Sequence, residues 1–348
     1  MLFKTMTFLR FEFDGNENEP SQSLIEENMG KLKFRRCLPT FLESSGFFHP
    51  YKPLTSVPDV KNSDEPSSEE DDDDDIDEQH VDDEVFASSI THSIDQAILF
   101  SVVIEKKDIS NIDLELRKRK KVKENLKRDG IDFKHVEESE IKRIMGEVHQ
   151  EVLDEMAKTA QVKLKRVEGV LDFKTSHLVI NSSSKPCIEK ICEMLDKVFG
   201  GNITLVPAKP AVDLVSIMTR WMDQNIEANP PSRFTLGTDC TLVQHGNKKT
   251  KVVCSNHDLH SNEISSHVTN YDKQVVKLSM FFEDKFCFDL DENFTFLKVK
   301  SQEGFIRKLD EAELDSQEQV RDTTLSLTMM FIREALSELY EYFKKSNR

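Results

Sequence analysis

Glycine is scarce in this chain, with 11 residues in 348, and none of them forms a phosphate-binding or dinucleotide-binding pattern. The GxSxG, HExxH and CxxC motifs are also absent, so no nucleophile elbow, zincin helix or paired-cysteine site is indicated. No stretch approaches ~18 consecutive apolar residues, and the N-terminus lacks the apolar core of a signal peptide. We therefore expect a cytoplasmic protein that is not an enzyme and has no cofactor, bound metal or membrane span.

Tryptophan and tyrosine are rare as well, with one and four residues, whereas phenylalanine occurs 23 times. The apolar packing should therefore depend largely on phenylalanine. Six cysteines are scattered along the chain, which is typical of buried free thiols in a reducing compartment.

The acidity of the chain is concentrated in one segment. The total net charge is -17, and Asp59 to Glu84 contains fifteen Asp or Glu and one Lys, a net of -14. Adjacent like charges repel, and the segment has too few apolar residues to offset the entropy of ordering. We expect an acidic disordered insertion over residues 53–92. A sharper alternative is a phosphate mimic that covers the protein's own basic surface.

A basic stretch from Lys106 to Arg128 stands out against this acidity. Its ten Lys or Arg and four acids give a net charge of +6. Such a stretch is typical of a surface that faces a polyanion such as a nucleic acid, although a solvated helix face remains the alternative. The basic residues are Lys106, Lys107, Arg117, Lys118, Arg119, Lys120, Lys121, Lys123, Lys127 and Arg128.

The same stretch predicts a helix. Ser110 is a suitable N-cap, and Asp129-Gly130 would end the helix. Its few apolar positions do not form a wide core face, so the helix should be mostly exposed. Two smaller basic patches, each as readily explained as an ordinary surface, are Lys163, Lys165 and Arg166, and Lys248, Lys249 and Lys251.

The rest of the chain mixes amphipathic helices with antiparallel hairpin patterns. Without a βαβ rhythm, this predicts an α+β fold of antiparallel sheets with packed amphipathic helices. We divide the chain into an N-terminal strand and helix (1–52), the insertion (53–92), a helical and hairpin region (93–230), and a β-hairpin region with a C-terminal helix (231–348). Helices are expected over 21–32, 141–156, 184–199, 211–225 and 322–344, and strands over 2–13, 97–104, 163–172, 176–181, 202–206, 274–282 and 285–290.

The order of these patterns resembles the RdgC family, the recombination-associated DNA-binding proteins of bacteria. The resemblance covers most of the chain except residues 53–92 and the C-terminal fifth, and it lies in ordered core patterns rather than a catalytic signature. It is carried by LFKTMTFLRF, FRRC with GFFHP, ILFSVVIEKKDI, LDFKTSHLVIN, LVPAKP, HDLHSNEISSHV and QVVKLSMFFEDKFCFDLDENFTFLKVK.

The resemblance implies an elongated, horseshoe-like subunit that forms a homodimeric ring around double-stranded DNA. Binding would be independent of base sequence, nucleoid-associated, and would limit access of a RecA-type recombinase to DNA. Two departures affect this inference. The acidic segment is enlarged relative to the family, and Cys254 to Leu259 lacks the basic residues usual before the Asp-Leu of the later helix.

Other chemistry is weakly indicated. Cys254, His257 and His260 could offer metal ligands, but zinc sites usually show tighter paired spacing. Asp289 and Asp291 could mimic part of a nuclease site, although charged turns explain them more simply. A second class of function is a protein-interaction scaffold that binds a basic partner through the acidic loop.

Overall fold

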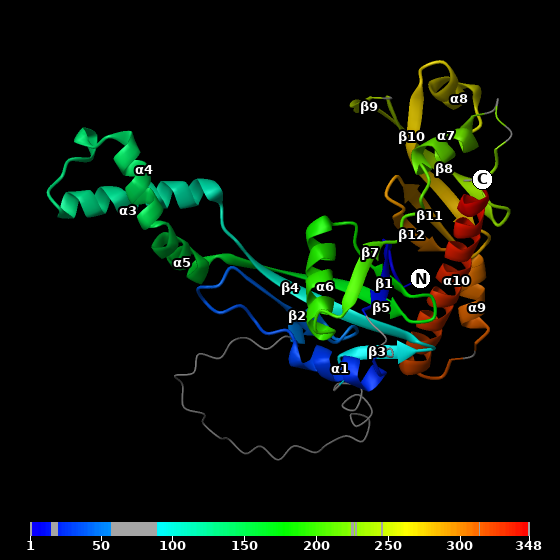
Figure 1. The fold of residues 1–348 in the computed structure, drawn as a ribbon, viewed down its shortest axis with the longest axis horizontal. Coiled ribbons are helices and arrows are strands. Elements are labelled where there is room, and N and C mark those ends of the chain that lie inside the picture. Colours follow the sequence, from blue (N-terminus) through cyan, green and yellow to red (C-terminus); the bar gives the residue numbers. More distant parts are fainter. Residues whose placement is uncertain are drawn as a thin grey trace, which may run out of the picture. The chain divides into compact units, whose positions relative to one another are not determined.

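The computed structural model describes residues 2–14, 20–56, 89–223, 226, 228–244, 246–312 and 314–346. The chain forms two compact units (Figure 1). Unit 1 comprises residues 1–25, 91–100 and 168–348, and unit 2 comprises residues 26–90 and 101–167. Most of the insertion expected over residues 53–92, including Asp59 to Glu84, lies outside the described residues.

The secondary structure mixes helices with two antiparallel sheets, which confirms the α+β class. The strands are β1 (Thr7–Phe13), β2 (Glu43–Phe48), β3 (Thr91–Ile94), β4 (Ala97–Asp108), β5 (Gln161–Asp172), β6 (His177–Ile180), β7 (Ile203–Pro207), β8 (Phe234–Gln244), β9 (Asn247–Cys254), β10 (Lys273–Phe282), β11 (Phe286–Asp291) and β12 (Phe296–Ser301). The helices are α1 (Gln22–Lys31), α3 (Asn111–Arg128), α4 (Glu138–Glu147), α5 (His149–Thr159), α6 (Lys185–Val198), α7 (Leu214–Met222), α8 (Asn262–Thr269), α9 (Glu303–Asp310) and α10 (Gln317–Ser346), with short 3-10 turns η1 (Leu54–Ser56) and η3 (Phe133–His135).

The first sheet has the strand order β2-β4-β5-β6-β1-β7, and β3 also pairs with β4. Strand β1, which lies within the range predicted as a strand, alternates in burial from Leu9 to Glu12: Leu9 and Phe11 are buried while Arg10 and Glu12 are exposed. Phe8 is buried as well, and its ring lies 4.8 Å from that of Phe296 in β12. Both faces of β1 therefore contribute to the core of unit 1.

The second sheet, β12-β11-β10-β8-β9, lies within unit 1 and is packed with phenylalanine. Phe282, Phe286, Phe288 and Phe296 are each at most 1% exposed. The rings of Phe288 and Phe296 stack with their centroids 4.0 Å apart. This cluster confirms that phenylalanine supplies much of the apolar packing.

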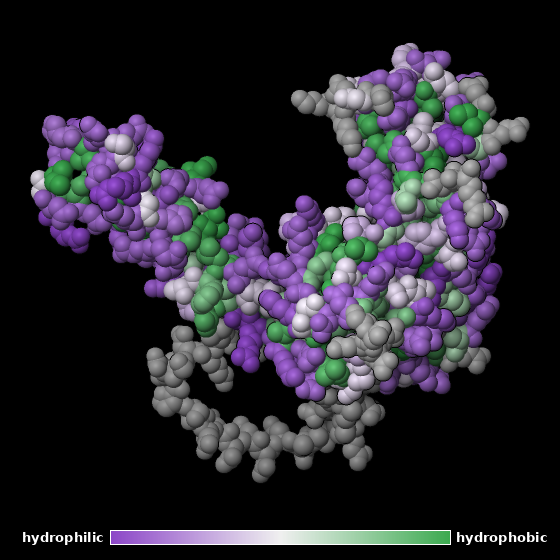
Figure 2. Space-filling view, viewed as in Figure 1, coloured by the Kyte–Doolittle hydropathy of each residue, from purple (hydrophilic) through white to green (hydrophobic). Residues whose placement is uncertain are grey.

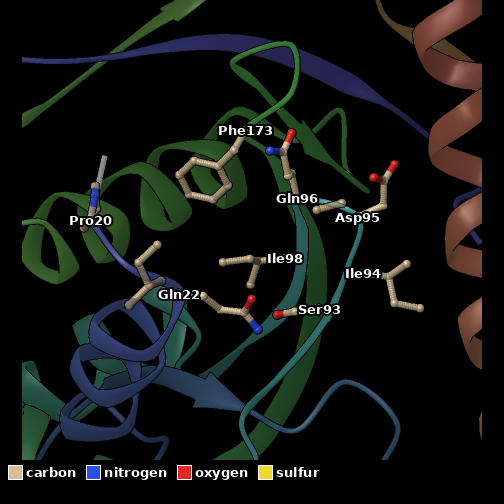
Figure 3. A pocket seen from close by; sticks show the side chains of 10 residues that line it. Pro20, Gln22, Ser93, Ile94, Asp95, Gln96, Ile98 and Phe173 are labelled. Atoms are coloured by element: carbon tan, nitrogen blue, oxygen red, sulfur yellow. The ribbon is translucent and has the colours of Figure 1, made fainter. Parts of the chain in front are cut away.

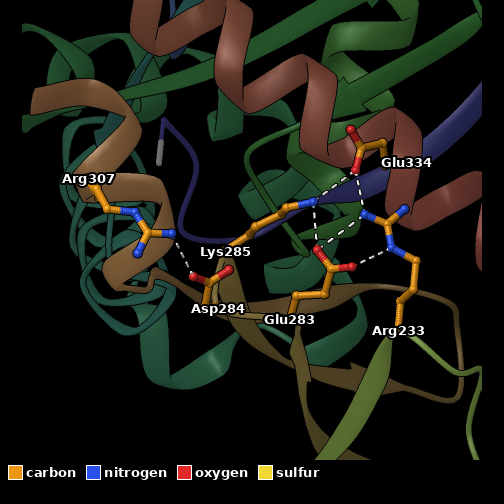
Figure 4. Close-up of polar contacts among 6 residues, drawn as sticks. All are labelled: Arg233, Glu283, Asp284, Lys285, Arg307 and Glu334. Atoms are coloured by element: carbon orange, nitrogen blue, oxygen red, sulfur yellow. Dashed lines mark hydrogen bonds and ion pairs between the residues drawn. The ribbon is translucent and has the colours of Figure 1, made fainter. Parts of the chain in front are cut away.

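Helix α10 extends beyond the predicted C-terminal helix, 322–344, at both ends. It buries an apolar stripe made of Leu325, Met329, Ile332, Leu336, Leu339 and Phe343. Ion pairs connect the polar side of α10 to neighbouring elements. Glu334 binds Arg233 at 2.7 Å and Lys285 at 3.0 Å, and both cations also contact Glu283 (Figure 4). The residue before Glu334, Arg333, pairs with the buried Asp172 at 2.8 Å.

The described residues of unit 2 form two separate small cores. One includes Phe34, Phe48 and Val103, beside a close contact at Gly46, where a Cβ would lie 2.4 Å from the Phe34 backbone. The other lies among α3, α4 and α5. The single helix predicted over 141–156 is two helices, because the backbone turns at Val148, which ends α4 and precedes α5.

Candidate nucleic-acid interface

Helix α3 is formed by local signals at both ends. The Ser110 hydroxyl accepts a hydrogen bond from the Asp113 amide at 3.4 Å, as an N-cap does. At the other end Gly130 has a φ of 75°, and the Ile131 amide donates to the Leu126 carbonyl at 2.8 Å. The predicted helix between Ser110 and Gly130 is therefore confirmed.

One face of α3 is buried against α4 and α5. Its four buried positions follow i, i+4 spacing: Leu114, Lys118, Val122 and Leu126. They pack near Met145, Val148, Val152 and Met156. The buried stripe is narrow, as expected for a mostly exposed helix, and the apolar residues Ile112 and Leu116 of α3 lie outside it, 73% and 61% exposed.

Three of the predicted basic residues are engaged within unit 2. Lys107 is buried in β4, and its ammonium donates to the carbonyls of Leu38 at 3.0 Å and Pro39 at 2.5 Å. Lys118 is buried and pairs with Glu115. Lys121 contacts Glu151 and Glu155 at 2.9 Å each, and these hydrogen bonds raise the pKa of its ammonium.

The other cations of the stretch lie at the surface. Lys106 is exposed in β4, which continues four residues beyond the predicted strand because Lys106 pairs with Glu43 in β2. Within the described part of the chain, Arg117, Arg119, Lys127 and Arg128 form no ion pair within 4.0 Å. Lys120 lies 3.9 Å from Glu124, and Lys123 lies over the Phe133 ring at 4.9 Å. The six exposed cations of α3 are Arg117, Arg119, Lys120, Lys123, Lys127 and Arg128, hereafter the α3 cations.

The surface around α3 is strongly polar. Figure 2 shows the helical segment α3–α5 covered mainly by hydrophilic residues. The exposed Lys134 of η3, which contacts α3, extends the basic surface beyond the predicted stretch. Lys134 was not predicted as a DNA contact, because it follows the Asp129-Gly130 turn and is the only lysine or arginine in its segment.

The second basic patch on β5 is partly neutralised. Lys163 donates to Asp108 at 2.5 Å, and this bond lowers the pKa of the Asp108 carboxyl. Arg166 donates to the carbonyls of Pro50, at 3.2 Å, and Lys52, with its guanidinium 5.4 Å from the Phe48 ring. Lys165 is exposed.

The third basic patch lies in unit 1, on β9. Lys251 is exposed and opposite Val243 of β8. Lys248 and Lys249 also belong to β9, and their side chains lie outside what the structure describes.

The weaker chemical candidates have structural partners. Asp289 pairs with Lys298 at 3.1 Å, and the Asp291 carboxylate accepts from the amides of Asn293 and Thr295 at 2.9 Å each. Cys254 faces Cys240 across a strand pair. Among the described residues, no group of three or more His, Cys, Asp or Glu is placed to hold a metal ion.

A cavity of about 230 Å³ in unit 1 is lined by Gln22, Asp95, Gln96, Phe173 and their neighbours (Figure 3). Its carboxylate, that of Asp95, pairs with Arg333 at 2.9 Å, and no lysine or arginine lines the cavity. This cavity therefore lacks the charge that would attract a phosphate.

Comparisons with known proteins agree with the resemblance. A family model described as "RdgC: Putative exonuclease, RdgC" matches residues 85–346, a range that includes α3 and also the C-terminal helix. A "Recombination-associated protein RdgC" of Halorhodospira halophila is 25% identical over 202 residues, or 58% of this chain and 65% of that protein.

Two further proteins of the same name give similar values. The protein of Xanthomonas oryzae is 27% identical over 57% of this chain and 65% of its own length, and that of Stenotrophomonas maltophilia is 27% identical over 62% and 71%. The match thus spans 65% of the length of the first two relatives. None of the described helices is long and apolar enough to cross a membrane.

Proposed function

The chain belongs to the RdgC family, and from this premise we propose that it binds double-stranded DNA without reading base sequence, through the α3 cations. The observation that carries the proposal is that these six side chains are exposed while Lys107, Lys118 and Lys121 of the same stretch are engaged. Exposed cations on a helix favour binding to DNA, because their contacts with phosphates release condensed counterions.

The spacing of the α3 cations suits a phosphate backbone. Positions i and i+4 of a helix are about 6 Å apart along its axis. Phosphates of one strand recur about every 3.4 Å along duplex DNA, so flexible lysine and arginine side chains find acceptors whatever the bases are. Such contacts would position the protein on the duplex without reading its base sequence.

The larger assembly is also part of the proposal. We expect a homodimer that closes a ring around DNA, associates with the nucleoid in the cytoplasm, and limits access of a RecA-type recombinase. The exposed apolar side chains of Ile112 and Leu116 support a contact between copies, because association would remove them from water.

We propose binding without cleavage, although the family model carries the words "Putative exonuclease". The carboxylates of Asp289 and Asp291, the acid pair considered from sequence, are occupied by Lys298 and by turn amides. Incubation of end-labelled duplex with the protein and Mg²⁺ or Mn²⁺ should leave the DNA intact. Progressive loss of the label would establish a nuclease instead.

A gel shift with linear and circular duplexes of equal length, together with sizing of the free protein, tests the main proposal. We expect both duplexes to shift. The complex with the linear duplex should then dissociate, because the ring slides off free ends, whereas the complex with the circular duplex should persist. A monomeric protein that shifts neither duplex would overturn the proposal.

The scaffold alternative is separated by deleting residues 59–84. If the acidic segment covers the basic surface, DNA affinity should rise after the deletion. If instead the segment is the binding element, a basic partner should be lost and DNA binding should be absent with or without it.

A further inference from the structure

Two cysteines of unit 1 face each other across the strand pair β8–β9. The register places Cys240 opposite Cys254. Directly opposite residues of an antiparallel pair have side chains on the same face and Cα atoms about 4.5 or 5.5 Å apart. Both separations lie within the roughly 4.4–6.8 Å that a disulfide spans. The backbone therefore already holds the two thiols at a separation at which they can bond.

The two thiols differ in access. Cys240 is 2% exposed, because β8 lies between β9 and β10 and the buried Leu278 of β10 is its other neighbour. Cys254 is the last residue of the edge strand β9 and is partly exposed. A reagent in solvent therefore reaches Cys254 first, with Cys240 directly behind it.

The chain after Cys254 is held against β8. The Asn256 amide donates to the Asp239 carboxylate at 2.8 Å, and the His257 amide donates to the Thr238 carbonyl at 3.0 Å. These bonds restrain Cys254 beside Cys240. Burial and the neighbouring Cys254 sulfur raise the pKa of the Cys240 thiol, which disfavours Cys240 as the first nucleophile.

The other cysteines in the described helices and strands lack such an arrangement. Cys287 is opposite Phe281 and Lys300 in its two strand pairs. Cys187 and Cys192 lie on one helix, α6, and burial raises the pKa of the Cys192 thiol. Within the described strand registers, Cys240 and Cys254 are thus the pair that is directly opposed.

We propose that Cys240 and Cys254 are an oxidation site that forms a reversible disulfide on reaction with a hydroperoxide. The Cys254 thiolate attacks a peroxide oxygen, the O–O bond breaks, and a sulfenic acid forms as the alcohol, or water from hydrogen peroxide, leaves. The Cys240 sulfur then attacks the Cys254 sulfur, the S–O bond breaks, and the hydroxyl leaves as water with the Cys240 proton.

Each disulfide consumes one hydroperoxide, and the two electrons that reduce the peroxide come from the two thiols. A small thiol reverses the reaction by exchange. The bond would link the edge strand β9, which carries Lys251, covalently to its neighbour β8. This inference does not rest on the proposed DNA binding.

The test treats the reduced full-length protein with hydrogen peroxide, blocks remaining thiols with N-ethylmaleimide under denaturing conditions, and maps unreduced peptides by mass spectrometry. Trypsin separates the two cysteines at Lys248, Lys249 and Lys251. We expect a linked pair of peptides containing Cys240 and Cys254, two hydrogens lighter than the sum of the reduced peptides, which dithiothreitol separates.

Variants assign the order of events. Cys240→Ala should leave a sulfenic acid on Cys254 that dimedone traps, whereas Cys254→Ser should leave Cys240 as a thiol. Cys192→Ser is the control and should form the linked peptides as the wild type does. Recovery of Cys254 as the maleimide adduct while other cysteines are oxidised, or its conversion to sulfinic acid with Cys240 still a thiol, would overturn the proposal.

Discussion

The sheet β8–β12 of unit 1 and the helical segment α3–α5 of unit 2 differ in what fills them and in what their cations contact. The sheet is packed with phenylalanine, and its neighbouring Arg233 and Lys285 are held by two glutamates. The core of α3–α5 consists of aliphatic residues and methionine, and six cations of α3 remain exposed. Arg233 and Lys285 therefore stabilise the fold through ion pairs, whereas the six α3 cations are exposed to solvent.

The largest expected effect concerns the phenylalanine core of the sheet β8–β12. Phe288→Ala should destabilise unit 1 by about 4 kcal/mol, because it removes a fully buried ring stacked on Phe296 and leaves a cavity. Urea unfolding followed by circular dichroism measures the loss. Phe41→Ala is the matched control, since Phe41 is 58% exposed and its loss should cost less than about 0.5 kcal/mol. Equal costs would contradict the assignment of the core.

A second prediction concerns ion pairs that stabilise the fold. Asp172→Ala should cost about 3 kcal/mol, because Asp172 is fully buried and its loss deprives Arg333 of its closest carboxylate. The exposed pair of Asp108 and Lys163 in unit 2 gives the control, and Asp108→Ala should cost roughly 0–1 kcal/mol. A similar cost for both variants would contradict the greater contribution expected of the buried ion pair.

The third prediction tests whether the α3 cations bind DNA. Replacing Arg119, Lys120, Lys123 and Lys127 by glutamine should weaken binding to duplex DNA about 100-fold at fixed salt, since four of six proposed phosphate contacts are lost. Fluorescence anisotropy with two unrelated sequences measures the change, which should be the same for both.

A control for net charge accompanies this variant. Four exposed but paired cations outside α3 are replaced by glutamine instead: Lys31, Lys142, Lys185 and Arg307. The control carries the same change in charge and should weaken binding less than about threefold. If it weakens binding as much as the α3 variant, position on α3 does not matter.

The smallest effect concerns pH. The hydrogen bond from Arg233 holds the pKa of Glu283 at about 2, against an ordinary value of 4.5. Because the folded-state pKa is lowered, this contribution is present above about pH 5 and is lost as pH falls towards 2. Glu283 is one-third exposed, so we expect less than about 1 kcal/mol. The stability difference between wild type and Glu283→Gln should shrink from pH 6 to pH 3, and a constant difference would contradict this.

The parts of the fold that were predictable depend on local signals. The cap of α3 at Ser110 and the turn at Gly130 each follow from neighbouring residues. The break at Val148 was not predictable, because the apolar spacing continues from α4 into α5.

In the candidate site, too, local features were predictable and long-range contacts were not. The charge of the basic stretch is visible in the sequence, but the partners of its lysines are not. Lys107 donates to the carbonyl of Leu38, 69 positions away in the sequence, and Lys121 donates to the carboxylate of Glu155, 34 positions away. Only the fold separates these engaged lysines from the α3 cations.

The most direct test of the central claim is the salt dependence of binding to duplex DNA. With six α3 cations on phosphates, log K against log salt concentration should have a slope of about -5, and the four-glutamine variant of α3 should have a slope of about -2. A flat response of the wild-type protein, or the same slope for both proteins, would contradict the account.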